Sequence, residues 1–236
     1  MFYRLSNTAS TKSIESELGI SFKYPQLYTP RSLINGLEEN AVPLVTMENP
    51  NQISFGIWGI LPEDYGEEWS DFQNAQNTLN LSHDECLESD IWYSRAIANR
   101  RCLIVATGFF TFYLSQGEIF PFYVHHPGDK PLTIGGVYNQ LQDGFITCAI
   151  LVSESMELVE NLENLDNGMP LVLPASGMKA WMSPGNNLEE LKNFVCQAPG
   201  ADLAAHPISR EFFKHSDPGQ SLLNPYDYKG LEEVDI

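Results

Sequence analysis

The fold of this chain is decided by residues 99–114, NRRCLIVATGFFTFYL. Residues 102–105, CLIV, are apolar throughout, which is typical of a central strand covered on both faces. Gly108 interrupts the run, and the aromatic residues of 109–114 suit a second pleated strand. The sequence therefore predicts two consecutive strands that form a wall, with Thr111 in the middle of the second strand.

Segments on both sides of this wall extend the sheet. Strands are predicted over residues 42–47, 53–61, 119–126, 132–138, 145–152 and 169–173, and short helices over 12–18, 91–99, 156–164, 176–182 and 188–195. Thr11 and Ser155 are suited to cap two of these helices. Residues 21–41 and the chain after His206 are predicted to be irregular. This pattern predicts an α+β fold, a single domain over residues 1–228 with a mostly antiparallel, barrel-like β-sheet and flanking short helices, followed by a tail at 229–236.

The charge balance bears on possible partners. The 236 residues include 13 Lys and Arg against 31 Asp and Glu, a formal net charge of −18. Because nucleic-acid binding depends on Lys and Arg contacts with phosphates, little material remains for a basic groove, and we expect any DNA binding to be weak.

Several features predict a cytoplasmic protein without membrane contact. No stretch reaches the roughly 20 apolar residues of a membrane-spanning helix. The start, MFYRLSNTASTKS, lacks the apolar run of a secretory signal. Four cysteines lie far apart without a CxxC pair, and Cys102 and Cys148 are expected to be buried free thiols.

Motifs of the common catalytic and cofactor-binding sites are missing from the sequence. It contains no GxSxG, HExxH, DxDxDG or phosphate-binding glycine loop. His125 and His126 are adjacent in a predicted strand, where successive side chains point to opposite faces, so they cannot both bind one ion. The residues themselves predict neither a metal site nor a cofactor.

Several blocks in a fixed order resemble the SRAP family, the SOS-response-associated peptidase domain proteins that process abasic sites in DNA. RRCLIVATGFF at 100–110 is similar to the family's RRCLVPADGFYEW, and WGILP at 58–62 to its WGLIP. MPLVLP at 169–174 and the following AWM resemble the family's MPVIL segment and its tryptophan. PFYV, IGGVY and HPIS match smaller family blocks. The resemblance runs from the first residue to about Tyr228 and implies the SRAP fold, with single-stranded DNA as the partner.

The resemblance also implies abasic-site processing and SOS-response-associated peptidase activity. In this family, removal of the initiator methionine exposes a cysteine at position 2. Its amine forms a Schiff base with the ring-opened abasic site, and its thiol closes the adduct to a thiazolidine that crosslinks protein and DNA. An asparagine orients the cysteine, the glutamate of GFYEW transfers protons, and the histidine of HDRMP assists.

This chain departs from the family pattern at the reactive positions. Phe2 stands in place of the cysteine, while Arg4 matches the arginine of the family's MCGR start, so we expect residue 1 to be the true N-terminus. Thr111 replaces the glutamate, and Asp166 replaces the histidine. The family positions for catalysis are therefore not intact.

The asparagine is the one reactive position that survives. It is best placed at Asn80, with Asn74 as the weaker alternative. With Asn80, Ser82 stands where the family has a DNA-contacting arginine, and Gly168 stands in place of a second one.

Together these losses favour a non-catalytic SRAP homologue, whose former pocket binds a small molecule or a protein or serves only the structure. Two alternatives stay open. One is a single-stranded or damaged-DNA binder that does not crosslink. The other is an enzyme with relocated residues, such as Asp166 with His206 and Asn80, around the old cleft. The candidate pocket residues are Arg4, Asn80, Ser82, Gly168 and His206.

Overall fold

Strand β7, Arg101–Ala106, lies within the larger of two β-sheets. The computed structural model describes residues 3–82, 92–153, 168–196, 200–214 and 219–229. All six residues of β7 are buried, which confirms the predicted central strand. An apolar run of this kind is stable in a sheet because packed side chains cover both of its faces.

Five strands of the larger sheet close into a barrel. In ring order they are β10 (Leu132–Gln140), β7, β4 (Ala41–Thr46), β5 (Gln52–Trp58) and β11 (Ile146–Ser153). The parallel pairing of β11 with β5 closes the ring, and the other four pairings are antiparallel. The short strands β2 (Ser21–Phe22), β6 (Asn80–Ser82) and β12 (Met169–Pro170) extend it. The predicted α+β fold with a barrel-like sheet is confirmed.

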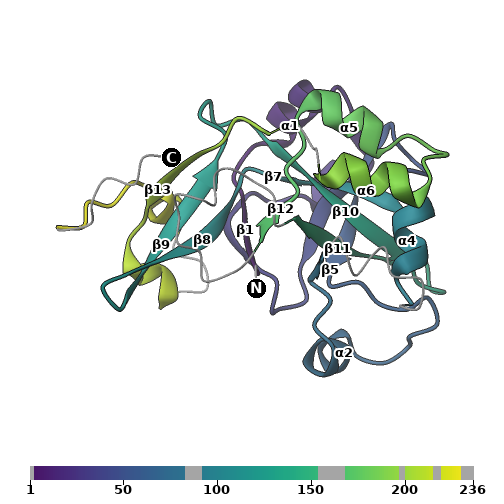
Figure 1. The fold of residues 1–236 in the computed structure, drawn as a ribbon, viewed down its shortest axis with the longest axis horizontal. Coiled ribbons are helices and arrows are strands. Elements are labelled where there is room, and N and C mark those ends of the chain that lie inside the picture. Colours follow the sequence, from purple (N-terminus) through teal and green to yellow (C-terminus); the bar gives the residue numbers. More distant parts are fainter. Residues whose placement is uncertain (1–2, 83–91, 154–167, 197–199, 215–218, 230–236) are drawn as a thin grey trace.

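The second sheet has five strands and lies beside the barrel, on the left in Figure 1. Its order is β13 (Ala204–Pro207), β9 (Glu118–His125), β8 (Gly108–Ser115), β1 (Arg4–Asn7) and β3 (Arg31–Asn35). The prediction that residues 99–114 form one wall was therefore wrong, because β7 and β8 belong to different sheets. Gly108 makes the crossing possible, since a Cβ there would lie 2.4 Å from a ring carbon of Tyr123.

Two layers of apolar side chains stabilise the barrel. One alternate set of strand residues, including Cys102, Ile104 and Cys148, forms the central core cluster, to which the second sheet also contributes. The other set, including Leu103 and Val105, packs under the helices. These helices are α1 (Thr11–Leu18), α4 (Ser94–Asn99), α5 (Ala175–Trp181) and α6 (Leu188–Cys196), seen along the upper right of Figure 1. Cys102 and Cys148 are buried free thiols, as predicted.

Arg101 connects the barrel to the helices that pack on it. Its side chain is fully buried, and its guanidinium donates hydrogen bonds of 2.6–2.7 Å to four backbone carbonyls, those of Ile97, Ala98, Trp181 and Ser183. Burial lowers the pKa of this guanidinium. Four carbonyl partners compensate a charge that would otherwise be costly to remove from water.

Several local predictions need correction. Helix α1 is capped by Ser10, not by Thr11, because the Ser10 hydroxyl accepts a hydrogen bond from the backbone N–H of Ser13. The segment predicted as irregular contains β2 and β3, which pair with β5 and β1, and β13 extends to Pro207, into the start of the tail predicted to be irregular. Residues 169–173 form a strand only over β12, and the helix predicted from residue 91 begins at Ser94. The helix predicted over 156–164 and its cap Ser155 lie outside the described residues.

The remaining elements are short. They are the helix α2 (Trp69–Ala75) and the 3-10 helices η1 (Pro25–Leu27), η3 (Arg210–Phe213) and η4 (Gln220–Leu223). Among the helices that the structure describes, none has the length and apolar character to cross a membrane.

Candidate functional site

Thr111 lies on β8, directly opposite Phe122 of β9, and is only 5% exposed. Side chains two residues apart share a face of a strand, so Thr111 is on the same face as Phe109, a member of the central core cluster. A threonine hydroxyl donates and accepts hydrogen bonds but does not ionise near neutral pH. This position therefore offers a neutral polar group in apolar surroundings.

Asn80 and Ser82 lie on β6, which runs parallel to β11. Asn80 is half-buried and opposite Ile150, and Ser82 is opposite Val152. The alternative Asn74 is exposed on helix α2.

Strand β12 pairs with the same end of β11. Pro170 of β12 is also opposite Val152, and Gly168 immediately precedes this strand. Two strand spacings separate β6 from β12, about 10 Å. The structure thus places Ser82 and Gly168 in one neighbourhood of the barrel.

Arg4 lies on the opposite face of the second sheet from Thr111. Its guanidinium is stacked over the ring of Phe212, at 4.4 Å, and the ring of Tyr3, at 5.0 Å. Phe110 contacts the same Phe212 ring at 4.7 Å, and the side chains of Phe110 and Thr111 point to opposite faces of β8. The Nε and Nη1 atoms of Arg4 are buried and find no hydrogen-bond partner among the described residues.

His206 lies on β13, in a cavity that none of the other described candidates lines. This cavity, the histidine cavity, has a volume of about 540 Å³ and is lined by Thr8, Thr107, Tyr123, His125, Asp129, His206 and residues 223–225. Burial lowers the pKa of His206. Phe2 and Asp166, the other two predicted positions, lie outside the described residues.

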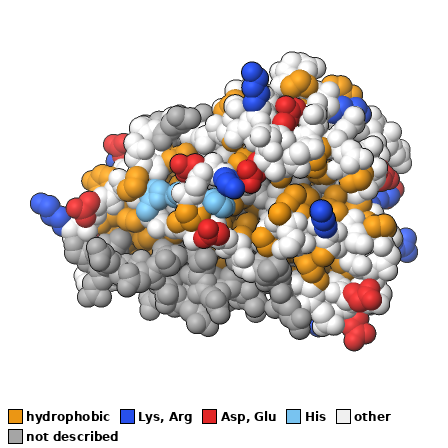
Figure 2. Space-filling model, turned by 90° about the horizontal axis from the view of Figure 1, so that it is seen from above, with side chains coloured by type: hydrophobic (Ala, Val, Ile, Leu, Met, Phe, Trp, Pro, Cys, Tyr) orange, Lys and Arg blue, Asp and Glu red, His pale blue; other side chains and the backbone are white. Residues whose placement is uncertain are grey.

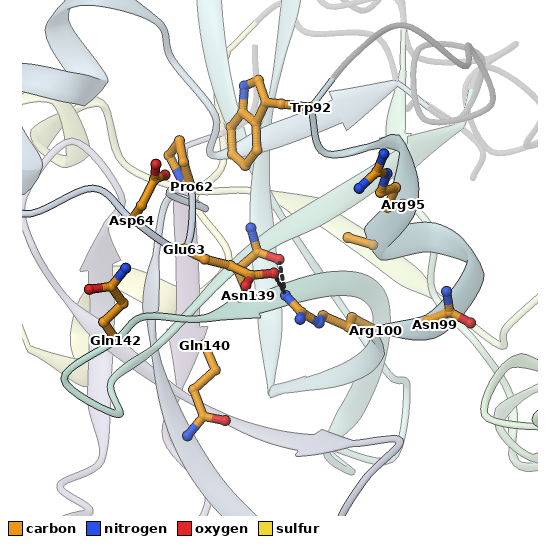
Figure 3. Close-up of a pocket in the computed structure, with 11 residues that line it drawn as sticks. Pro62, Glu63, Asp64, Trp92, Arg95, Asn99, Arg100, Asn139, Gln140 and Gln142 are labelled. Carbon is orange, nitrogen blue, oxygen red and sulfur yellow. Dashed lines mark hydrogen bonds and ion pairs between the residues drawn. The ribbon is translucent and has the colours of Figure 1, made fainter.

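A larger cavity, of about 680 Å³, opens where the chain after β5, helix α4 and the end of β10 meet (Figure 3). We call it the amide cavity, because four of its lining side chains are amides. Its lining residues are Pro62, Glu63, Asp64, Trp92, Arg95, Ala96, Asn99, Arg100, Asn139, Gln140 and Gln142.

The centre of the amide cavity is a polar network. Arg100 is ion-paired with Glu63 and donates a hydrogen bond of 2.9 Å to the Asn139 amide oxygen. The Asn139 amide nitrogen in turn donates to the Leu61 carbonyl at 2.9 Å. Figure 3 shows Glu63, Asn139 and Arg100 converging, with Trp92 and Arg95 at the rim. The cavity therefore offers an aromatic surface, amide groups and the cation of Arg95 to a planar polar ligand.

The amide cavity was not predicted from the sequence. The signal in the sequence is the four-residue spacing of Arg95 and Asn99, which places them on one face of α4, whereas Trp92 precedes this helix. The contribution of β10 was not visible, since it depends on the pairing of β10 with β7.

Comparison with known proteins identifies the family. The profile of a family described as SOS response associated peptidase (SRAP) matches residues 1–215. This chain belongs to the SRAP family. The SRAP match spans both sheets and all the helices α1 to α6 named above.

Distant relatives of this SRAP-family chain carry a functional name. The abasic site processing protein YoqW of Bacillus subtilis (strain 168) is 20% identical over 205 residues, which cover 84% of this chain and 75% of YoqW. The abasic site processing protein YoaM of the same organism is 19% identical over 177 residues, covering 72% of this chain and 74% of YoaM.

Solved structures share the SRAP-family fold. A crystal structure of a protein from Bacteroides thetaiotaomicron matches with a TM-score of 0.82 and 18% identity, covering 95% of this chain and 99% of that chain. Another, from Bordetella bronchiseptica, matches with a TM-score of 0.70 and 15% identity, covering 88% and 99%.

Proposed function

We propose that this SRAP-family protein does not form the abasic-site crosslink, and that its former catalytic cleft binds a small molecule or a protein or serves only the structure. The observation that carries the proposal is Thr111. It stands where the family has its proton-transferring glutamate, on a face that joins the central core cluster, and it is almost fully buried. A neutral hydroxyl there does not replace a carboxylate as an acid or base.

The N-terminal sequence supports the same conclusion. Phe2 supplies no thiol, so a Schiff base formed at this end has no group to close it to a thiazolidine. A bulky residue after the initiator methionine also disfavours removal of that methionine, so we expect Met1 to be retained. Intact-mass spectrometry tests this expectation.

The decisive experiment is incubation with abasic single-stranded DNA followed by denaturing electrophoresis. We expect no crosslinked band from the unmodified protein, while a family member that carries the cysteine gives one under the same conditions. Phe2→Cys alone should restore little activity, because loss of one acid or base group typically costs about 10²–10⁴ in rate. A stable band from the unmodified protein would refute the proposal.

A second candidate function is weak, non-crosslinking contact with single-stranded nucleic acid at the amide cavity. Trp92 offers a ring on which a base stacks, and the exposed Arg95 a cation for a phosphate. The net charge of −18 opposes such binding, so we expect a Kd of about 10⁻⁴ M or weaker near physiological salt.

Fluorescence anisotropy with a labelled single strand distinguishes the two functions. Lys179→Ala is the matched control for Arg95→Ala, because each removes one exposed positive charge and only Arg95 lines the cavity. Weak binding near this Kd that is lost in Arg95→Ala and kept in Lys179→Ala would favour the nucleic-acid function, and micromolar binding would contradict the expected weak affinity.

A further inference from the structure

Two histidines that are far apart in the sequence meet at the edge of the second sheet. His125 ends β9 and His206 lies in the adjacent strand β13, where it is opposite Tyr123. The centroids of the two imidazole rings are 5.2 Å apart, with the rings tilted at 74°. The Tyr123 ring stacks on His125 at 5.1 Å and 9°, which fixes the plane of that ring.

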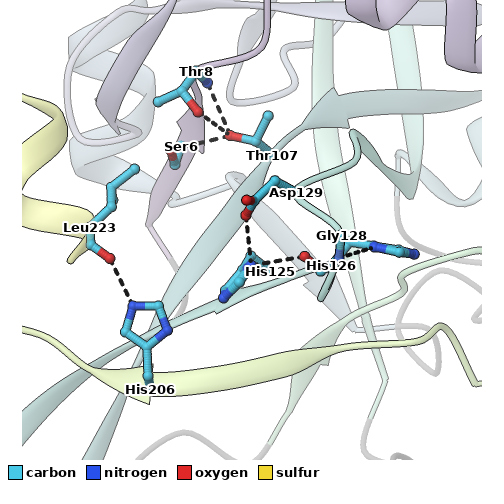
Figure 4. A network of polar contacts seen from close by, with 9 residues as sticks. All are labelled: Ser6, Thr8, Thr107, His125, His126, Gly128, Asp129, His206 and Leu223. Carbon is cyan, nitrogen blue, oxygen red and sulfur yellow. Dashed lines mark hydrogen bonds and ion pairs between the residues drawn. The ribbon is translucent and has the colours of Figure 1, made fainter. Parts of the chain in front are cut away.

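The hydrogen bonds of the two rings define which nitrogens are available. Nδ1 of His125 is 2.9 Å from the carbonyl oxygen of His126, and Nε2 of His206 is 2.7 Å from that of Leu223. A carbonyl oxygen only accepts, so each of these nitrogens carries a hydrogen and donates it. In the neutral rings, Nε2 of His125 and Nδ1 of His206 then have free lone pairs. Figure 4 shows these two nitrogens on the sides of the rings that face one another.

Metal-binding histidines adopt this arrangement. A histidine that binds a metal almost always donates its other ring N–H to a carbonyl or a carboxylate, which holds the ring in orientation. Both rings do so here, and the Asp129 carboxylate is 3.4 Å from Nδ1 of His125.

The spacing of the rings agrees with this role. Metal–nitrogen bonds of about 2.0–2.1 Å place each ring centroid about 3.2 Å from the ion, so two imidazoles at a tetrahedral angle have centroids about 5.2 Å apart. The observed separation is 5.2 Å.

The histidine cavity leaves the rest of the coordination sphere open. Its volume of about 540 Å³ has room for water or a larger oxygen ligand, and Thr8, Thr107 and Asn224 contribute polar groups to its wall. Among the described residues, no group of three or more His, Cys, Asp or Glu side chains is placed to hold a metal. In the space-filling view of Figure 2, histidine side chains reach the surface between apolar atoms and carboxylates.

We propose that His125 and His206 form a two-histidine site for a divalent transition-metal ion such as Zn²⁺, bound through Nε2 of His125 and Nδ1 of His206. Water or an exogenous ligand in the histidine cavity occupies the remaining positions. Imidazole ligands suit Zn²⁺, Cu²⁺ and Ni²⁺, and the general order of affinities places Cu²⁺ above Zn²⁺. Neither histidine is one of the family's reactive positions, and the proposal does not depend on whether the chain crosslinks DNA.

The test is calorimetric titration of the full-length, tag-free protein with ZnCl₂. His125→Gln and His206→Gln should each weaken binding by about 10–100-fold or more, since even the loss of a group that only supports a ligand has an effect of that size. His126→Gln is the matched control, because His126 is adjacent to His125 and its ring accepts from the Gly128 N–H instead. We expect it to leave the affinity unchanged.

A second measurement identifies the ligating atoms. In long-range ¹H–¹⁵N spectra, Zn²⁺ should shift Nε2 of His125 and Nδ1 of His206 and leave the His126 ring unaffected. Thermal melts without metal show whether each variant is folded. If the His206→Gln variant is unfolded, the proposal is tested by the affinity of His125→Gln and by the ¹H–¹⁵N spectra of the unmodified protein. Absence of Zn²⁺ binding, or equal weakening in the His126→Gln control, would overturn the proposal.

Discussion

Replacing Thr111 with glutamate, the residue that the family resemblance implies at this position, should destabilise the protein in a pH-dependent way. Thr111 is 5% exposed, and it shares its surroundings with Phe109 and Phe122. A carboxyl group among such residues is neutral more readily than in water, so its pKa rises above the ordinary value of about 4.3. The pKa of a fully buried carboxyl shifts by up to about 3–5 units. We take a pKa shift of about 2 units here, because the residues of β8 that follow Thr111 are only half-buried.

The sign and size of the effect follow from this shift. Below about pH 4 the carboxyl is neutral in both the folded and the unfolded protein, so its charge does not affect stability. Between about pH 4.3 and 6.3 the carboxyl is ionised in the unfolded chain but not in the folded protein. The free energy of unfolding therefore falls by about 1.4 kcal/mol per pH unit over this range. At pH 7 the accumulated loss is about 2.7 kcal/mol, which lowers the Tm by about 5–10 °C for a chain of this size.

The assay is thermal and urea unfolding of Thr111→Glu beside Thr111→Gln at pH 4, 5, 6 and 7. The glutamine variant has the same shape without the charge, so the difference between the two variants isolates ionisation. We expect equal stability at pH 4 and a growing deficit of the glutamate variant as the pH rises. Equal stability at pH 7, or a more stable glutamate variant, would refute the reasoning, because the site would then be hydrated or hold a cation.

Three further predictions concern the core. Arg101→Met should lower the free energy of unfolding by at least about 3 kcal/mol in urea titrations, because the carbonyls that the guanidinium contacts lose a charged donor. Burial raises the pKa of the Cys102 and Cys148 thiols, so a thiol reagent followed by peptide mapping should label neither in the native protein and both after unfolding. Gly108→Ala should cost about 1–3 kcal/mol because its Cβ would overlap an aromatic ring carbon, whereas Gly66→Ala, with no atom within 4 Å, should change stability by less than about 0.5 kcal/mol.

A strand is well predicted from the sequence when its side chains are buried on one face only or on both faces. Residues 102–105 are apolar throughout, and β7 is accordingly buried on both faces. Segment 21–41 was misjudged, since its Tyr, Pro and Asn content conceals β3, whose Leu33 and Ile34 are buried on opposite faces of the sheet. Strand β3 is stabilised by pairing with β1, and such a pairing is a tertiary property that local propensity does not contain.

For the candidate site, too, some features follow from the local sequence and others depend on strand pairing. Placing Thr111 on a strand required only apolar patterning, and the structure has it on β8. No strand was predicted at Asn80, which lies on the three-residue strand β6 because that segment pairs with β11. Which of the candidate residues lie close together depends on the register in which the strands pair. Arg4 and Thr111 lie on neighbouring strands, yet the pairing of Leu5 with Phe109 directs their side chains to opposite faces of the sheet.

The histidines show most clearly how tertiary pairing creates a site. The two adjacent histidines have different partners, and Nδ1 of the His126 ring accepts a hydrogen bond from the Gly128 N–H. The partner of His125 comes instead from β13, whose sequence AAHP contains no β-branched or aromatic residue. This strand forms because the edge of β9 presents unpaired backbone groups to it. A short segment with weak strand propensity thus forms a strand because it pairs with the edge of β9. This pairing places the centroid of the His206 ring 5.2 Å from the centroid of the His125 ring.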